Sequence, residues 1–213
     1  MFRYRSLFAC ALTLALTLAA GSSINGQVGA GLLDANLVPE AELAAMPGMT
    51  PAIAKALVAA RPFATIVDLN KFLVDQKVAE EQIDAFYLKA FVHVNLNTGT
   101  REEILLIPNA GPRMVREFGE YRPWKTWEQF DKEIGKYVGA DETNRLKKYV
   151  FIPVNLNTAT NEDILIIPGA GNRMVREFNE YRPWKTKEQF EKEIGKYVGA
   201  NEVARLWRFV VIQ

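Results

Sequence analysis

Internal repetition limits the architectures open to this chain of 213 residues. Residues 94–152 recur at 154–212, and about three positions in four are identical between the two copies. A fainter copy covers residues 34–92 with its landmarks offset by one residue, so that Pro47 corresponds to Pro108. A fixed period of this length is typical of repeat architectures, and a unit of about 60 residues is marginally stable alone. We therefore expect three mutually supporting units, at residues 34–93, 94–153 and 154–213.

The first 26 residues have the layout of a secretory signal peptide. Arg3 and Arg5 precede an apolar run at residues 7–20, and small and polar residues continue to Gly26. The run is shorter than the ~20 residues that a membrane-spanning helix needs. We therefore predict cleavage between residues 20 and 26, export to the periplasm or the medium, and no stable membrane insertion afterwards; an uncleaved anchor is the alternative. Residues 27–33 are expected to form a linker to the first unit.

The exported chain offers few groups for catalysis or metal binding. Its only cysteine, Cys10, lies inside the signal, which leaves no disulfide, thiol nucleophile or thiolate ligand. His93 is the only histidine, and the sequence places no cysteine or carboxylate cluster near it. The sequence also lacks a Ser-His or Cys-His set and a phosphate loop with lysine. We therefore expect neither an enzyme nor a metal site, a cofactor or a small-molecule substrate.

Each unit has the start and stop signals of short helices. In the second unit, Thr100 followed by Glu103 predicts a capping box, and the apolar run that follows stops at Pro108. The expected helices of this unit lie between Thr100 and Ile107, from Pro112 to about Arg122, from Thr126 onward, and from about Asp141 to Tyr149. Strand signals are weak, and the β-branched segments 92–94 and 151–154 are interpreted as extended connectors. The predicted fold class is therefore all-α.

The turn between the first two helices of a unit contains the candidate functional residues. In the third unit it reads Ile-Pro-Gly-Ala-Gly-Asn-Arg over residues 167–173, and Arg176 follows. Two glycines around one small residue allow positive φ angles and close approach to another surface. The next helix begins with N–H groups that have no partner inside the helix, and such groups bind anions. The sequence therefore predicts an anion site at this turn.

This turn resembles the helix-hairpin-helix motif, in which a hydrophobic residue, Pro, Gly, a small residue and Gly precede a polar and a basic residue. Together with Val-Asn-Leu-Asn-Thr at residues 154–158 and Arg-Pro-Trp at 182–184, it makes the unit similar to the ComEA-type domain of exported competence DNA receptors. The resemblance covers about 180 residues and is strongest from Val94 to the end. It implies three tandem helix-hairpin-helix repeats that bind DNA through its phosphates, independently of sequence, during DNA uptake.

The resemblance also implies which residues contact phosphate. They are Gly169, Gly171, Asn172, Arg173 and Arg176 in the third unit, and Asn109, Gly111, Arg113 and Arg116 in the second. Asn109 replaces the first glycine, and asparagine tolerates positive φ better than most residues. In the first unit Thr50 replaces the second glycine and Ala52 the basic residue, so that hairpin is interpreted as structural. A remnant of a second hairpin, at residues 137–142 and 197–202, carries acidic residues, and we assign it no DNA contact.

The same arginines have a structural interpretation. Their spacing allows i,i+4 ion pairs between Arg113 and Glu117, Arg116 and Glu120, Arg173 and Glu177, and Arg176 and Glu180. Such pairs contribute only ~0.2–0.5 kcal/mol each. Arg113 and Arg173, however, occupy the first helical turn, where the macrodipole disfavours a cation, and this placement favours a bound anion.

The repeated motif Glu-Tyr-Arg-Pro-Trp-Lys-Thr, at residues 120–126 and 180–186, also has two interpretations. In the first, Trp124 and Trp184 stack on bases or contact a partner, beside two cations. In the second, they close the core below the second helix of the unit. We prefer the core interpretation because Phe63, in the first unit, retains only the apolar role.

Charge leaves a second function open. The first unit has 5 basic and 8 acidic residues, whereas the second has 10 and 9 and the third 9 and 8. A dedicated nucleic-acid binder usually shows a clear basic excess, which this chain lacks. The alternative to a DNA-binding protein is therefore a protein–protein scaffold, because the helix-hairpin-helix fold also resembles that of an extrinsic photosystem II subunit of the PsbU type. Fold alone does not decide between the two.

Overall fold

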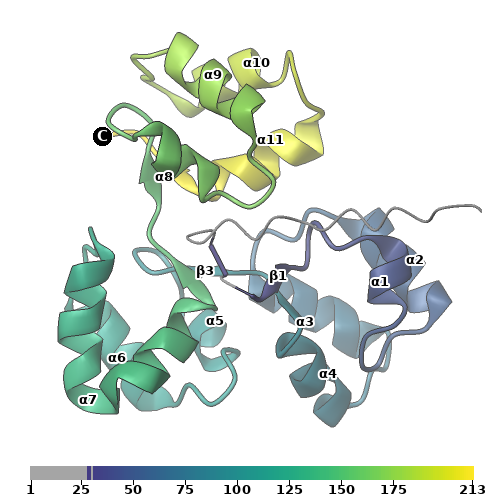
Figure 1. Ribbon diagram of the computed structural model, residues 1–213. Helices are drawn as coiled ribbons and strands as arrows, with labels where there is room; N and C mark the ends of the chain where they lie inside the picture. The colour runs from purple at the N-terminus through teal and green to yellow at the C-terminus, as the bar shows by residue number, and fades with distance from the viewer. Residues whose placement is uncertain (1–27, 30) are drawn as a thin grey trace, which may run out of the picture.

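A computed structural model describes residues 28–29 and 31–213. The predicted signal peptide lies outside the described residues. The fold is mostly helical: the described residues form eleven helices and six two-residue strands that are paired two by two (Figure 1). The predicted helical character is therefore confirmed. No helix within this described part is both long and apolar enough to cross a membrane.

The elements follow one order three times along the chain. The first segment contains β1 (Leu33–Asp34), α1 (Glu40–Leu43), α2 (Pro51–Ala60), α3 (Ile66–Asp75), α4 (Glu80–Tyr87) and β2 (Ala90–Phe91). The second contains β3 (Val94–Asn95), α5 (Arg101–Leu105), α6 (Pro112–Glu120), α7 (Trp127–Lys147) and β4 (Val150–Phe151). The third contains β5 (Val154–Asn155), α8 (Asn161–Leu165), α9 (Asn172–Glu180), α10 (Lys187–Ile194), α11 (Ala200–Trp207) and β6 (Val210–Val211).

The extended connectors are more than linkers, and this corrects the sequence interpretation. β1 pairs with β2, β3 with β4 and β5 with β6, each time in parallel. The backbone N–H of Val94, for example, donates to the carbonyl of Tyr149 at 2.9 Å. These joints are buried, so their backbone groups need partners, and the two ends of one segment supply them to each other. Each strand pair therefore closes a segment of about 60 residues.

Helix α7 joins two elements that the sequence predicts as separate. Gly139 interrupts it with φ 78° and ψ 172°, a conformation that suits glycine, so α7 consists of two helices that meet at a kink. In the third segment the corresponding helices, α10 and α11, are separate. The predicted helix starts are confirmed, because Thr100 and Thr160 form complete capping boxes and Thr126 accepts from the N–H of Gln129.

An asparagine fixes the turn after the second helix of each segment. Asn97 accepts from the backbone N–H of Trp124 at 2.6 Å and donates to its carbonyl at 2.9 Å. Asn157 and Trp184 repeat these bonds, and so do Asn36 and Phe63. Trp124 and Trp184 are each 1% exposed, and their indole N–H groups donate to carbonyls of α6 and α9 at 2.8 Å. The core interpretation of these tryptophans is therefore confirmed.

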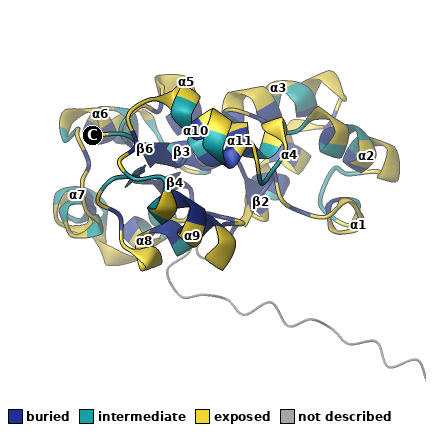
Figure 2. Cartoon of the chain, turned by 90° about the horizontal axis from the view of Figure 1, so that it is seen from above, coloured by how far each residue is buried: buried dark blue, intermediate teal, exposed yellow. Residues whose placement is uncertain are grey.

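Two hydrophobic cores hold the segments together. One core is a single cluster of buried residues between Leu32 and Val150, so the first two segments share it. The other contains the buried residues of the third segment together with Phe151 of β4, and Val28 packs against it. In Figure 2 the strands lie dark blue in the interior, and the exposed faces of the helices point outward. A shared core is consistent with the marginal stability of a single 60-residue unit.

The third segment also contacts the first through buried polar groups. Arg205 of α11 forms a bidentate pair with Glu202, and its Nη1 lies 3.9 Å from Asp34 Oδ2. Arg208 donates to the carbonyl of His93 at 3.0 Å. The His93 side chain is 1% exposed, and neither ring nitrogen has a hydrogen-bond partner among the described residues. Burial lowers its pKa from 6.5 to about 4, against the smaller opposing effect of Asp34.

Acidification should therefore destabilise the protein through His93. Above pH 6.5 the ring is neutral in both states; below it, the unfolded chain binds a proton that the folded chain excludes until about pH 4. The free energy of unfolding should fall by ~3 kcal/mol across this window, since one pKa unit corresponds to about 1.4 kcal/mol. Urea unfolding at pH 7, 5.5 and 4 measures the loss. His93→Leu should remove most of it, and an unchanged pH dependence in that variant would contradict the assignment.

Candidate functional site

The turns that the sequence singles out join α5 to α6 and α8 to α9. Asn109 and Gly169 have φ angles of 61° and 76°, and Gly48 of the first segment has 72°. The prediction that Asn109 tolerates the positive φ of the first glycine is confirmed. The second glycines differ from the expectation: Gly111 and Gly171 have φ of −94° and −112°. They are the N-cap residues of α6 and α9, where extended backbone is usual.

The starts of α6 and α9 are open to an approaching group. Apart from the adjacent residues, a Cβ atom placed on Gly111 or Gly171 would meet no heavy atom of the described residues within 4 Å. In the described structure, neither helix has a side-chain cap. At the corresponding position of α2, the hydroxyl of Thr50 accepts from the N–H of Ile53 at 3.2 Å. The helix start is thus closed in the first segment and open in the second and third.

Gly169 lies against another part of its own chain. A Cβ atom there would lie 3.0 Å from Arg205 Nη2 and 3.1 Å from Leu37 Cδ1. The close approach that this glycine permits is therefore to its own chain, at the contact between the third and first segments. Asn172, the first residue of α9, is exposed.

The hairpin arginines, Arg113, Arg116, Arg173 and Arg176, are all exposed. In the second segment, Arg116 Nη2 lies 2.9 Å from Glu117 Oε1, and Arg113 Nε lies 4.0 Å from the same oxygen. The Arg113 guanidinium stacks on the ring of Tyr137, 4.8 Å from its centre. Of the two expected i,i+4 ion pairs, the one between Arg113 and Glu117 is therefore long, and Arg116 pairs with the adjacent Glu117 instead of Glu120.

The third segment reproduces this arrangement. Arg176 donates to Glu177 Oε1 from Nε at 3.2 Å and from Nη2 at 3.0 Å. Arg173 stacks on Tyr197 at 5.1 Å, and the Tyr197 hydroxyl shares a 2.8 Å hydrogen bond with Tyr181. This bond, followed by the nearby Glu177 carboxylate, raises the pKa of Tyr197. In the second segment, the hydrogen bond with Tyr121 raises the pKa of Tyr137 to about 12.

A buried glutamate lies beneath each pair of arginines. The side chains of Glu117 and Glu177 are only 3% and 2% exposed, and their Oε2 atoms have no hydrogen-bond partner among the described residues. A buried carboxylate is costly unless it is paired with a cation, so these glutamates fix the arginines beside them. The burial of Glu117 could have been predicted from the sequence, because this residue falls on the apolar face formed by Met114, Phe118 and Tyr121. The first segment has Ala56 at this place.

The second-hairpin remnant supports the arginines. Tyr137 and Tyr197, on which Arg113 and Arg173 stack, come from this remnant, to which the sequence interpretation assigned no DNA contact. Lys136 and Lys196 add cations that stack on Tyr121 and Tyr181 at 5.2 and 5.1 Å, and each pairs with a nearby glutamate. Each site is therefore a cluster of arginines, tyrosines and one lysine around a buried carboxylate.

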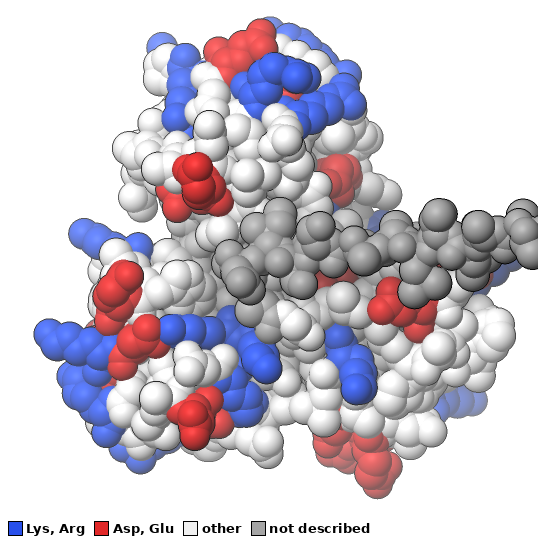
Figure 3. Space-filling model, in the orientation of Figure 1, with Lys and Arg blue, Asp and Glu red and all other residues white. Residues whose placement is uncertain are grey.

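Charged side chains are distributed in patches. In Figure 3, lysines and arginines gather over α6 and α7 at the lower left and over the third segment at the top, with acidic groups among them. The surface between these two groups is mostly uncharged in this view. On this face the basic groups therefore form separate clusters rather than one continuous stripe.

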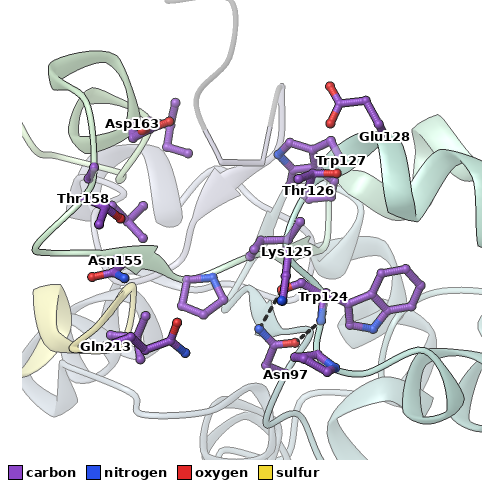
Figure 4. Close-up of a pocket in the computed structure, with 17 residues that line it drawn as sticks. Asn97, Trp124, Lys125, Thr126, Trp127, Glu128, Asn155, Thr158, Asp163 and Gln213 are labelled. Carbon is purple, nitrogen blue, oxygen red and sulfur yellow. Dashed lines mark hydrogen bonds between the residues drawn. The ribbon is translucent and has the colours of Figure 1, made fainter.

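A cavity of about 600 Å³ lies between the second and third segments. Lys125, Trp127 and Glu128 line it from one side, and Thr158 and Asp163 from the other (Figure 4). None of the predicted site residues lines it, and its charged groups have both signs.

Nothing in the described residues assembles three or more potential metal ligands in one place. The arrangement at each hairpin suits the binding of an anion from outside the helix start. No family model, curated protein or solved structure matched this chain.

Proposed function

We propose that this chain is an exported, non-enzymatic DNA-binding protein built from three tandem helix-hairpin-helix repeats. It holds the phosphate backbone without regard to sequence, through the α5–α6 and α8–α9 turns, in the course of DNA uptake. One observation carries the proposal: α6 and α9 both begin uncapped and open, with two exposed arginines fixed beside the opening.

The chemistry of this arrangement fits phosphate. The first N–H groups of a helix, together with the positive end of its dipole, attract an anion. Arginine adds charge-assisted hydrogen bonds with a planar geometry that matches phosphate oxygens. Contacts of this kind position a protein on DNA without reading its bases, so the binding is sequence-independent.

The first segment contributes no phosphate site in this proposal. Its helix α2 is capped by Thr50, and Ala52 and Ala56 occupy the places of the first arginine and the buried glutamate. Its net charge, with 5 basic and 8 acidic residues, also disfavours DNA.

The direct test measures binding of the exported chain to two duplexes of unrelated sequence at low salt. We expect similar affinity for both duplexes, because phosphate contacts carry no sequence information. Absence of binding to either duplex at low salt would rule the proposal out.

The buried glutamates allow a test that separates two effects: the net charge of the protein, and the positioning of the arginines by the glutamates. Glu117→Gln with Glu177→Gln raises the net charge by two, as does Glu120→Gln with Glu180→Gln on the exposed side of the same helices. Charge alone predicts tighter DNA binding for both double variants. If the buried glutamates hold the arginines, the first pair should instead bind about 5- to 10-fold more weakly, roughly 1–1.4 kcal/mol. Fluorescence anisotropy measures both affinities, and equal tightening in the two double variants would refute the positioning role.

A further inference from the structure

A groove of about 720 Å³ lies between α4 and the turn that joins α5 to α6. Figure 1 shows α4 and α5 in the lower half of the molecule, where the first and second segments meet. We propose that this groove binds an amphipathic helix of a partner protein, with apolar side chains inserted in the groove and basic side chains at its edges. The inference does not depend on DNA binding.

Exposed apolar side chains converge on the groove. Leu88, Val74 and Leu105 line it and are 59%, 55% and 38% exposed, which makes Leu88 and Val74 the most exposed large apolar residues in the described chain. The buried residues Ile83 and Ile107 lie among them. Single exposed apolar residues are ordinary on protein surfaces, but several around one concavity indicate a binding site.

The other two segments do not have this apolar surface. Counted back from the closing strand, Leu88 corresponds to Lys148 and Arg208. Val74 directly follows a buried core residue of α3. In the other two segments, the residues that follow the corresponding buried core residue are Gly135 and Gly195. The two most exposed apolar residues of the groove are therefore particular to the first segment, which lacks the hairpin arginines.

Charge identifies the kind of partner. Glu80 and Asp84 line the groove, and none of its lining residues is a lysine or an arginine. Acidic side chains gather over α4 at the bottom of Figure 3. These carboxylates attract basic side chains and repel phosphate, so the α4 side of the groove complements a basic amphipathic helix, while Asn109 of the α5–α6 turn lines the opposite side.

The experiment uses the full exported chain and two synthetic peptides of about 16 residues, or four helical turns. Both have leucines at helical i, i+3, i+4 and i+7 spacing; one has lysines beside the leucines and the other has glutamates. Isothermal titration calorimetry should show that the lysine peptide binds at least ~10-fold more tightly than the glutamate peptide.

Two variants of equal charge change locate the binding. Val74→Gln with Leu88→Lys should weaken the lysine peptide at least ~10-fold, because it removes the two most exposed apolar contacts. Val67→Lys, at an exposed apolar residue of α3 outside the groove lining, should leave the affinity unchanged. Circular dichroism melting checks that both variants fold.

Three results would overturn the proposal. They are equal binding of the two peptides, unchanged binding to the Val74→Gln/Leu88→Lys variant, and a dimer of the wild-type chain that this variant abolishes, since a second copy would then fill the groove. Duplex binding by the Val74→Gln/Leu88→Lys variant should match that of wild type. If neither protein binds a duplex, the DNA-binding proposal fails and the groove proposal is unaffected.

Discussion

Alanine in place of all four hairpin arginines should weaken binding to a DNA duplex by at least ~100-fold. Each arginine loses a charge-assisted hydrogen bond to phosphate, and a combined loss of about 3 kcal/mol corresponds to that factor. Fluorescence anisotropy with a labelled duplex at low salt measures the change. The four side chains are exposed and belong to neither core, but their loss leaves the buried Glu117 and Glu177 without a cation, so circular dichroism melting must first show that the variant is folded.

A second quadruple variant with the same change in net charge separates the hairpins from general electrostatics. Lys125, Lys132, Lys185 and Lys192 are exposed and lie outside the hairpin turns. Their replacement by alanine should cost less than ~10-fold, since they only add to the long-range field. If the lysine and arginine variants lose affinity equally, the hairpins do not form the binding site.

Trp184→Ala should destabilise the third segment by ~3–5 kcal/mol, the usual cost of removing a buried aromatic side chain. Trp184 is 1% exposed and packs against Phe190, with ring centres 5.5 Å apart. Its loss would also leave the carbonyl of Phe178 without its indole donor. Because the third segment has a separate core, urea unfolding should show its transition at lower denaturant, ahead of the shared core.

Trp184→Phe is the matched control. Phenylalanine occupies the corresponding place in the first segment, where Phe63 keeps the same asparagine bonds. This variant should therefore cost only ~1–2 kcal/mol, mainly for the lost hydrogen bond and the smaller ring. Alanine and phenylalanine variants of equal stability would mean that Trp184 is not a core residue.

Local features of this fold could be predicted from the sequence. The capping residues Thr100 and Thr126 mark helix starts because their side chains bond within the next turn. Asn109 adopts positive φ because its short polar side chain tolerates that conformation. Trp124 is buried where the apolar replacement Phe63 indicated a core position. The caps and the conformation of Asn109 depend on neighbours within a few residues, and the burial of Trp124 could be predicted because the repeats can be compared with one another.

Features that depend on distant residues were missed. The parallel strands join residues such as Val94 and Val150, which lie 56 positions apart, and two-residue strands carry no periodic signal. The expectation of positive φ at Gly171, the second glycine of the third-unit turn, was wrong because it assumed a turn where the chain has an N-cap. The stacking of Arg113 on Tyr137 links two helices whose relative position the sequence does not specify.

The salt dependence of duplex affinity tests the central claim most directly. If each of the two hairpins contacts about two or three phosphates, the logarithm of the association constant should fall with log[salt] at a slope of roughly −4 to −5. Titrations of the wild-type chain between low and physiological salt measure this slope, and the variant without hairpin arginines should lose most of it. A duplex affinity that does not respond to salt, or no binding at low salt, would contradict phosphate binding by the α5–α6 and α8–α9 turns.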